Sequence, residues 1–540
     1  MTRERAARVF SIPPGAPFLP TLADALAAGE LVPGFRADGD PLALSTVTIY
    51  LPTRRAARAL RSIFVEKSPG GSAILPTIRA LGEFDEELAL IDPAGAAALD
   101  IAPPIADLDR VLALAPLVQK WKSRLPAHVA ALFQEEVVVP ASAADALWLS
   151  RDLAGLIDEM ETAGADWTRL AGLVDRDLAD WWRLTLDFLE IVTDYWPKAL
   201  AERQRSDPAA HRNAMIRAEA ARLKRGGGEG PIIAAGSTGS IPATAELLAT
   251  IARLPEGAVV LPGLDKRLDE EAWALLGEPS ASPSVYGHPQ FGLKRLVAAL
   301  GVARGDVTEI GTPPPPLAAR AAILSEALRP AESTEAWASN RGRVAEAVDA
   351  GALADVTLIE APNERDEALA IAYVLRLAAA EPGHRAALVT TDRALARRVA
   401  SELLRFGIVA DDSAGRPLAQ TPPAILLSPM VEAVMRPGDP VAILSFLKQP
   451  LLSLGIERAI VRRAAETVEL VALRGGTGRP DIGRLAEEFE ARLARLSGDP
   501  HMSAWFSRIR AGEVEEARQV LAALDTALAP LAALRKGETL

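Results

Sequence analysis

VTIYLPTRRAARALRSIFV, residues Val47–Val65, is typical of a buried strand followed directly by a basic helix. The first five residues are mostly aliphatic or β-branched, which favours a strand inside a sheet. Pro52 lacks the N–H that a strand ladder needs, and Thr53 belongs to the residue types that cap helices. We therefore predict a strand over Val47–Leu51 and a helix that begins at Arg54.

The predicted helix has a basic face and an apolar face. Its arginines at helical spacing share one side: Arg54, Arg58 and Arg61. Its apolar residues share the other side: Ala56, Leu60, Ile63 and Phe64. Free N–H groups, the positive end of the helix dipole and guanidinium groups then meet at the rim of a sheet, which suits a phosphate. The alternative is an ordinary surface helix with a solvated arginine face.

Composition favours a soluble protein of several domains. The length of 540 residues suggests about three or four domains. Hydrophobic residues make up 49% of the chain, which is enough for large cores. We find no apolar run long enough to cross a membrane and no signal peptide in the N-terminal MTRERAARVF, so we expect a cytoplasmic protein without a membrane partner.

The chain has no cysteine, and its five histidines are scattered without metal-ligand spacing. Disulfides, thiolate zinc sites and Cys-ligated clusters are therefore excluded within these residues. The formal net charge is −12, whereas a protein that coats nucleic acid through its overall field is basic. Any contact with nucleic acid must then be local, in a groove or along a stripe.

The N-terminal segment VFSIPPGAPF has the layout of a phosphate-binding loop without its chemistry. A strand is predicted over Arg8–Ile12, and a helix over Leu19–Ala28 follows the loop. A working loop needs several glycines, a lysine for the phosphates and a Ser or Thr for Mg²⁺. This loop has Gly15, three prolines and no lysine, and Thr21 is the only nearby hydroxyl. We therefore predict a degenerate nucleotide loop that does not hydrolyse ATP.

Further strand and helix signals define two α/β units. The first continues with strands within Ile74–Phe84, Pro231–Ala235 and Ala258–Leu261 and with a helix over Ala243–Arg253. In the GSTGS loop before that helix, either Ser240 or Thr244 caps the helix or the loop forms a small anion nest. A helix over Arg320–Trp337 is also predicted. The second unit is predicted from strands Val356–Glu360, Ala386–Thr390 and Ile408–Ala410 and from helices Asn363–Ala379 and Arg393–Phe406.

The order of these elements resembles the UvrD-like superfamily 1 helicases. Thr53–Phe64 resembles the family's motif Ia, which contacts single-stranded DNA. Glu364–Leu377 and Ala386–Gly415 resemble the start of the second helicase lobe around motif IV. The nucleotide-handling motifs are replaced: IPPGAPF stands at the Walker A position, GSTGSIP at the acidic box and LPGLDKRL at the Gly-Asp-x-x-Gln motif. The resemblance thus implies a helicase scaffold that has lost its ATPase site.

Within that superfamily, the chain resembles the AddB family of alphaproteobacteria, the partner subunits of the bacterial AddAB helicase–nucleases. The stretches that carry this resemblance are VFSIPPGAPFLPTLADAL, TIYLPTRRAARAL, ILPTIRALGE, HPQFGLKRLVAALGVARGDV and SEALRPAEST. Members of the family are longer, so the resemblance implies that these residues are an N-terminal half. A nuclease site with Mg²⁺ and a Cys-bound 4Fe–4S cluster are implied only for the other half, and no cofactor is expected in this segment.

The resemblance implies an α/β fold with two RecA-like parallel-sheet lobes of an inactivated helicase and helical insertions. The expected division is 1–95 for the first part of lobe 1A, 96–228 for a helical insertion like domain 1B, 229–345 for the rest of lobe 1A and a linker, 346–425 for the first part of lobe 2A, and 426–540 for a helical segment like domain 2B.

The expected function is that of a non-catalytic DNA-binding subunit. It would grip a single strand at double-strand DNA ends and scan for a recombination hotspot while an AddA-type helicase–nuclease subunit hydrolyses ATP. The DNA-binding residues that the resemblance implies are Thr53, Arg54, Arg55, Arg58, Thr391 and Arg393. A plain helix cap is the alternative at Thr391 and Asp392. Two other functions stay open: a divergent ATPase that binds nucleotide through Gly15, Thr21 and GSTGS, and a protein-interaction scaffold without DNA contact.

Overall fold

The structure is a computed structural model. It describes residues 6–37, 42–68, 74–81, 101–124, 142–167, 169, 185–186, 188–226, 230–277, 283–436, 438–474, 482–498 and 504–535. The chain divides into two compact units, Met1–Thr357 and Leu358–Leu540. The expected boundaries at 95/96 and 228/229 lie outside the described residues, and those at 345/346 and 425/426 fall inside the helices Ala336–Asp349 and Pro422–Met435.

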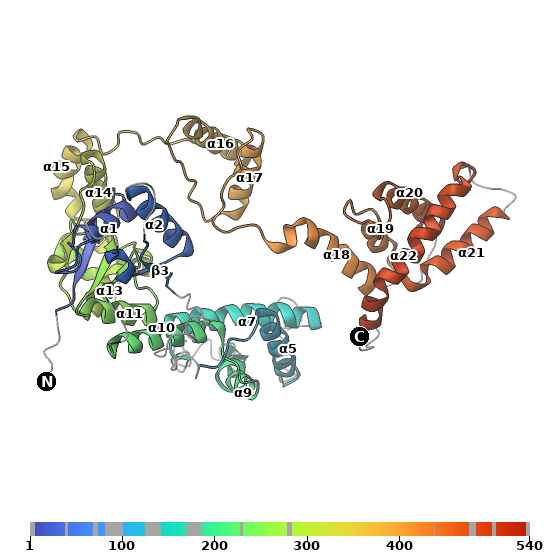
Figure 1. Ribbon diagram of the computed structural model, residues 1–540, viewed down its shortest axis with the longest axis horizontal. Coiled ribbons are helices and arrows are strands. Elements are labelled where there is room, and N and C mark those ends of the chain that lie inside the picture. Colours follow the sequence, from blue (N-terminus) through green and yellow to red (C-terminus); the bar gives the residue numbers. More distant parts are fainter. Residues whose placement is uncertain are drawn as a thin grey trace. The chain divides into compact units, whose positions relative to one another are not determined.

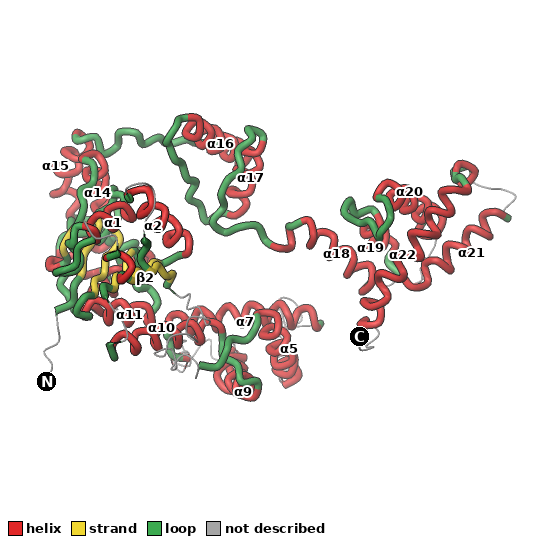
Figure 2. Tube along the Cα trace, viewed as in Figure 1, coloured by secondary structure: helices red, strands yellow, loops and turns green. Residues whose placement is uncertain are grey.

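The first unit contains all the strands of the described residues (Figures 1 and 2). The strands are β1 (Val9–Ile12), β2 (Thr48–Leu51), β3 (Thr77–Ala80), β4 (Ile232–Ala235), β5 (Gly257–Pro262) and β6 (Thr308–Glu309). The main helices are α1 (Phe18–Ala27), α2 (Arg54–Lys67), α5 (Asp107–Arg124), α7 (Ala143–Ala163), α9 (Trp196–Glu202), α10 (Pro208–Lys224), α11 (Pro242–Arg253), α12 (Glu270–Leu275), α13 (Phe291–Leu300), α14 (Pro315–Ala327) and α15 (Ala336–Asp349). A π-helical turn, Ile191–Tyr195, leads into α9.

The six strands form one sheet in the order β3-β2-β4-β5-β1-β6, and every pair is parallel. Parallel sheets are covered on both faces, and this one is. On one face, Ile49 and Leu51 of β2 pack in a core with α1 and α2; on the other, Tyr50 packs in a core with α10, α11, α12 and α13. Successive residues of β2 thus point to opposite cores, as strand geometry requires.

The predicted strand and helix at the motif Ia-like stretch are confirmed. β2 and α2 follow each other as expected, and the Thr53 hydroxyl accepts a 3.1 Å hydrogen bond from the Ala56 amide at the start of α2. The buried face of α2 consists of Ala57, Leu60 and Phe64, while Ala56 and Ile63 are only half-buried. The predictions of β1, β4, β5, α1 and α11 are also confirmed within a residue or two.

The helices between β3 and β4 have a core of their own. Leu114 and Val118 of α5, Leu153 and Ile157 of α7, and Trp196 of α9 lie in this core. Within it, the buried Arg110 side chain pairs with Asp158 and with the buried Asp207, both at 2.9 Å. The Trp196 indole N–H also donates to Asp207, at 2.9 Å.

A buried polar contact ties these helices to the sheet. The Tyr50 hydroxyl of β2 donates to Glu219 of α10 at 2.5 Å, and Arg222 pairs with the same carboxylate at 2.7 Å. Burial raises the pKa of Tyr50 above its usual range, and the neighbouring Glu219 charge adds to that shift. Burial also acts to raise the pKa of Glu219, but hydrogen bonds from Arg222 and Tyr50 outweigh it and hold the pKa of this carboxyl below its usual range. The pair is therefore a phenol donating to a carboxylate.

The second unit is helical throughout its described residues. Its helices are α16 (Glu364–Ala380), α17 (Arg393–Leu404), α18 (Pro422–Met435), α19 (Pro440–Leu447), α20 (Arg458–Val468), α21 (Leu485–Ser497) and α22 (Ala511–Arg535). The helices α16 and α17 pack on each other around Ala372, Val399 and Leu403. A larger core joins α18, α19, α20, α21 and α22.

The predicted strands of the second α/β unit are wrong. Residues 356–360, 386–390 and 408–410 are extended loops without strand pairing, as Figure 2 shows around α16 and α17. Apolar side chains stand in solvent there: Leu358 is 84% exposed, Val389 94% and Val409 83%. Only Leu388 and Ile408 touch the core of α16 and α17. A strand needs neighbours for its backbone groups, and these segments have none among the described residues.

The exposed segments predict a measurable apolar surface. Changing Leu358, Val389 and Val409 together to threonine replaces one methyl group of each valine by a hydroxyl and shortens the leucine, so that each exposed side chain becomes polar. The triple variant should bind less of the dye ANS than the parent chain, with unchanged far-ultraviolet circular dichroism. Dye fluorescence equal to that of the parent chain would show that these side chains are covered in solution.

The expectation that no apolar run is long enough to cross a membrane needs correction. Within the described residues, α22 contains a stretch, Ala511–Leu534, whose length and apolar composition would suffice for a membrane span. Its inward face nevertheless supplies part of the second unit's core, through Ala517, Val520, Leu521, Leu524 and Leu528. The structure is therefore compatible with a soluble protein.

Candidate nucleic-acid interface

Because all six strands are parallel, the loops that follow them meet at one edge of the sheet. Ligands of open α/β sheets bind at this carboxyl edge, where the helices after neighbouring strands lie on opposite faces. The strands β1 and β5 fulfil this condition, since α1 packs on one face and α12 and α13 on the other. So do β2 and β4, since α2 and α11 are likewise divided between the faces.

The start of α2 presents the predicted DNA-binding side chains at this edge. Thr53, Arg54, Arg55 and Arg58 are all exposed. The Thr53 hydroxyl serves as the helix cap. Arg61, one turn further on, donates instead to the carbonyl of Ile78 in β3, at 2.8 Å, and thereby fixes the helix against the sheet. The structure thus brings three exposed arginines together beside a helix N-terminus.

The degenerate nucleotide loop after β1 has few N–H groups to offer. Three of the five residues 13–17 are prolines, and the Ala16 amide donates to the Pro13 carbonyl at 3.2 Å. Gly15 adopts φ +91°, and a Cβ placed on it would lie 2.7 Å from Cβ of Leu317. A phosphate cradle needs several convergent N–H groups and open space before them. This loop lacks the convergent N–H groups, and it has no open space because it packs against α14.

Packing also fills the crevices on either side of the loop. Gly263, which follows β5, faces Pro14, whose Cγ would lie 3.2 Å from a Cβ placed on this glycine. Gly236, which follows β4, is enclosed in the same way. A Cβ placed on it would lie 3.2 Å from the Phe18 ring and 3.5 Å from Cδ of Pro52. Thr21 packs against Gly311 and donates its amide to the Pro17 carbonyl. The residues predicted for nucleotide, Gly15 and Thr21, therefore lie among apolar and proline contacts.

The GSTGS loop does not cap α11 as predicted. The helix begins with Pro242 after Ile241, and no side chain caps it, so the roles expected for Ser240 and Thr244 are wrong. Proline suits the first helical position because its missing N–H would be unpaired there anyway. The Ser237 hydroxyl instead accepts from the Gly239 amide at 3.2 Å, and Gly239 itself has φ +60°.

The second pair of predicted residues belongs to the other unit. Asp392 caps α17 by accepting from the Ala394 and Leu395 amides, which confirms the helix-cap alternative. The Arg393 guanidinium forms two hydrogen bonds to Asp412, at 3.1 and 2.6 Å, which raise the pKa of Arg393 above its usual range. Thr391 is exposed. The Asp412 carboxylate thus compensates the charge of Arg393.

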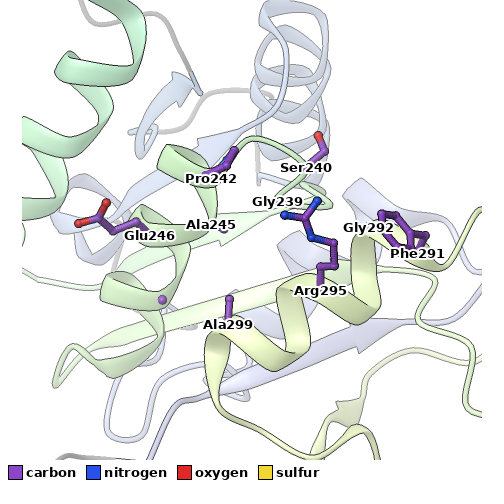
Figure 3. A pocket seen from close by; sticks show the side chains of 10 residues that line it. Gly239, Ser240, Pro242, Ala245, Glu246, Phe291, Gly292, Arg295 and Ala299 are labelled. Atoms are coloured by element: carbon purple, nitrogen blue, oxygen red, sulfur yellow. The ribbon is translucent and has the colours of Figure 1, made fainter. Parts of the chain in front are cut away.

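Sequence reasoning missed a groove at the same carboxyl edge. It lies between α11 and α13, has a volume of about 470 Å³ and is lined by Ser240, Ala245, Phe291 and Arg295 among others (Figure 3). The available signal was one aromatic residue, Phe291, followed closely by the basic Lys294 and Arg295. Among the described residues, no group of three or more His, Asp or Glu side chains is placed to hold a metal ion.

No protein-family model matches the chain, and no curated protein matches it.

Proposed function

We propose that the chain is a helicase-like, non-catalytic DNA-binding subunit of the AddB type. In this role it grips one strand of a processed double-strand end, while an AddA-type partner hydrolyses ATP and moves the complex. Scanning for a recombination hotspot belongs to the same proposal. Its membership of the UvrD-like superfamily rests on the motif Ia-like and motif IV-like stretches, and the six-stranded parallel sheet is compatible with a RecA-like lobe.

One observation carries the proposal. Three exposed arginines stand at the start of α2, on the ligand-binding edge of the sheet, while the place for a nucleotide beside β1 is packed by proline, phenylalanine and leucine side chains. Phosphate contacts position a nucleic-acid strand without reading its sequence. A sheet edge with this distribution of charge and packing therefore suits a polyphosphate backbone better than a nucleoside triphosphate.

The second unit supports the proposal in a weaker way. Its helices α16 and α17 lie within or over the stretches that resemble the start of the second helicase lobe. Extended segments with apolar side chains flank these helices. Parallel strands need further strands beside them and a second layer above them. The proposal assigns these segments to the first part of a lobe 2A.

Titration with Mg–ATP tests the loss of nucleotide chemistry. We expect no saturable binding by calorimetry at millimolar ATP, because the loop after β1 lacks a lysine and packs against α14. The same preparation should bind a single-stranded oligonucleotide, which shows that the protein is folded. Saturable ATP binding that Thr21→Val abolishes would favour the divergent ATPase instead.

A further inference from the structure

We propose that the groove between α11 and α13 takes one nucleotide of a single strand, with its base stacked beside Phe291 and its phosphate on Arg295. The inference rests on the proposed function and adds a second contact to it. The α2 arginines would hold the backbone of the strand, and the groove would receive a base that has turned away from it.

The groove has the size and lining of a ligand site. Its volume of about 470 Å³ falls in the range of small-molecule pockets, which is about 300–1,000 Å³. Small residues form much of its lining: Gly239, Ala245, Ala249, Gly292 and Ala299. Because these side chains are short, the two helices leave a depression that a planar ring can enter. Phe291 and Arg295 line it from α13.

Two lining side chains, Phe291 and Arg295, lie close to a further aromatic ring. The Phe291 ring packs edge-on against Tyr286, with ring centres 5.2 Å apart, and Tyr286 is 57% exposed. The Arg295 guanidinium lies 5.7 Å from the centre of the Phe291 ring. In Figure 3 its side chain rises from α13 toward Gly239 in the loop before α11. Proteins that bind single strands combine such aromatic surfaces with arginine, because every base has a face that stacks.

The groove adjoins the arginine-bearing edge. Its Gly239 and Ser240 belong to the loop after β4, and the arginines of α2 follow β2, which is the neighbour of β4 in the sheet. Gly236 of the same loop lies close to Pro52, the residue directly before Thr53. A Cβ placed on Gly236 would lie 3.5 Å from Cδ of Pro52. The loop after β4 therefore touches the segment that leads into α2 and also lines the groove.

The charges of the groove favour an anionic occupant. Its acidic residue, Glu246, lies on α11 with its carboxylate 3.7 Å from Arg217. That pairing compensates the charge of Glu246, so Arg295 makes the charge of the groove positive. A protein segment with a carboxylate would also suit this charge. Continuity with three exposed arginines favours nucleic acid, because a polyanion gains from all four cations at once.

A labelled oligonucleotide with one 2-aminopurine tests the proposal on the full 540-residue chain. Binding should quench the probe by stacking. Arg295→Gln should lower the affinity and reduce the slope of log affinity against log salt by about 0.7, the value for one phosphate of a single strand. Tyr286→Ala and Phe291→Leu should lower affinity about five-fold or more and restore the fluorescence.

Arg151→Gln is the matched control, because Arg151 is an exposed arginine stacked on Trp148 of α7. This substitution should change neither the affinity nor the fluorescence.

The outcomes separate this inference from the proposed function. If Arg54, Arg55 and Arg58 variants lose affinity but Tyr286, Phe291 and Arg295 variants do not, the groove proposal is overturned and the proposed function stands. If the parent chain binds no oligonucleotide, both fall. If the groove variants lose only binding to a partner protein, the groove is a protein-docking site, which also overturns the inference.

Discussion

Replacing Arg54, Arg55 and Arg58 together by glutamine is expected to weaken binding of single-stranded DNA by about 10- to 100-fold near 0.1 M salt. Each phosphate contact on a single strand contributes roughly 0.7 to the slope of log affinity against log salt, so three lost contacts lower that slope by about 2. The arginines are exposed at the carboxyl edge of the sheet, next to the N-terminus of α2, where phosphate is favoured. Fluorescence anisotropy over a range of salt concentrations measures both quantities.

A control variant must remove equal charge elsewhere. Arg397 on α17 and Arg458 and Arg462 on α20 are likewise exposed, and their joint replacement by glutamine should leave the slope almost unchanged. Glutamine keeps the length and helix propensity of the α2 positions, so α2 itself should persist. Equal losses in the two triple variants would mean that overall charge, rather than the α2 site, governs binding. An unchanged slope in the α2 variant would favour the protein-interaction scaffold.

Arg110→Met is expected to destabilise the helices between β3 and β4 by about 3–5 kcal/mol. The side chain is buried, and its loss leaves the carboxylate of the buried Asp207 without its cation. Breaking one partner of a buried ion pair costs this much because the remaining charge is uncompensated. Hydrogen exchange of peptides from α5 and α7 is the suitable measurement, since a chain of two units does not unfold in one step.

A second substitution identifies the cause of that loss. Asp207→Asn removes the leftover charge while its amide oxygen can still accept from the Trp196 indole. The double variant Arg110→Met with Asp207→Asn should therefore exchange more slowly than Arg110→Met alone. If the double variant is equally unprotected, lost packing of the Arg110 stem rather than an unpaired charge explains the effect.

The same ion pair predicts a pH dependence. Burial raises the pKa of Asp207 above its ordinary value of 3.8, and Arg110 opposes that shift. Without Arg110 the pKa rises further. A carboxyl whose pKa is raised in the folded state stabilises the fold below about 3.8, and this contribution is lost as pH rises through the folded-state pKa. The loss of stability caused by Arg110→Met should thus be smaller near pH 4 than near pH 7.

The sequence predicted the first unit well because its strands carry local signals. Runs such as Ile232–Ala235 are fully apolar and end in glycine or proline, which is typical of central parallel strands. β6 could not be predicted, because Thr308 and Glu309 are polar and exist as a strand only through pairing with β1. The single helix predicted over Arg320–Trp337 was wrong, since Pro330 interrupts it and two helices, α14 and α15, form instead.

The second unit shows the limit of local signals. Val356–Glu360, Ala386–Thr390 and Ile408–Ala410 have strand propensity, yet a strand forms only where another strand pairs with it. At the site, Thr53 and the α2 arginines were predictable from one stretch of sequence. The groove beside Phe291 and Arg295 was not, because it depends on the spacing of α11 and α13, which lie far apart in the chain.

Titration of a labelled single-stranded oligonucleotide with the 540-residue chain, over a range of salt and with or without Mg–ATP, tests the central claim most directly. The account predicts that log affinity falls linearly with log salt and that ATP leaves the curve unchanged. Binding that requires ATP, or no binding even at low salt, would contradict it.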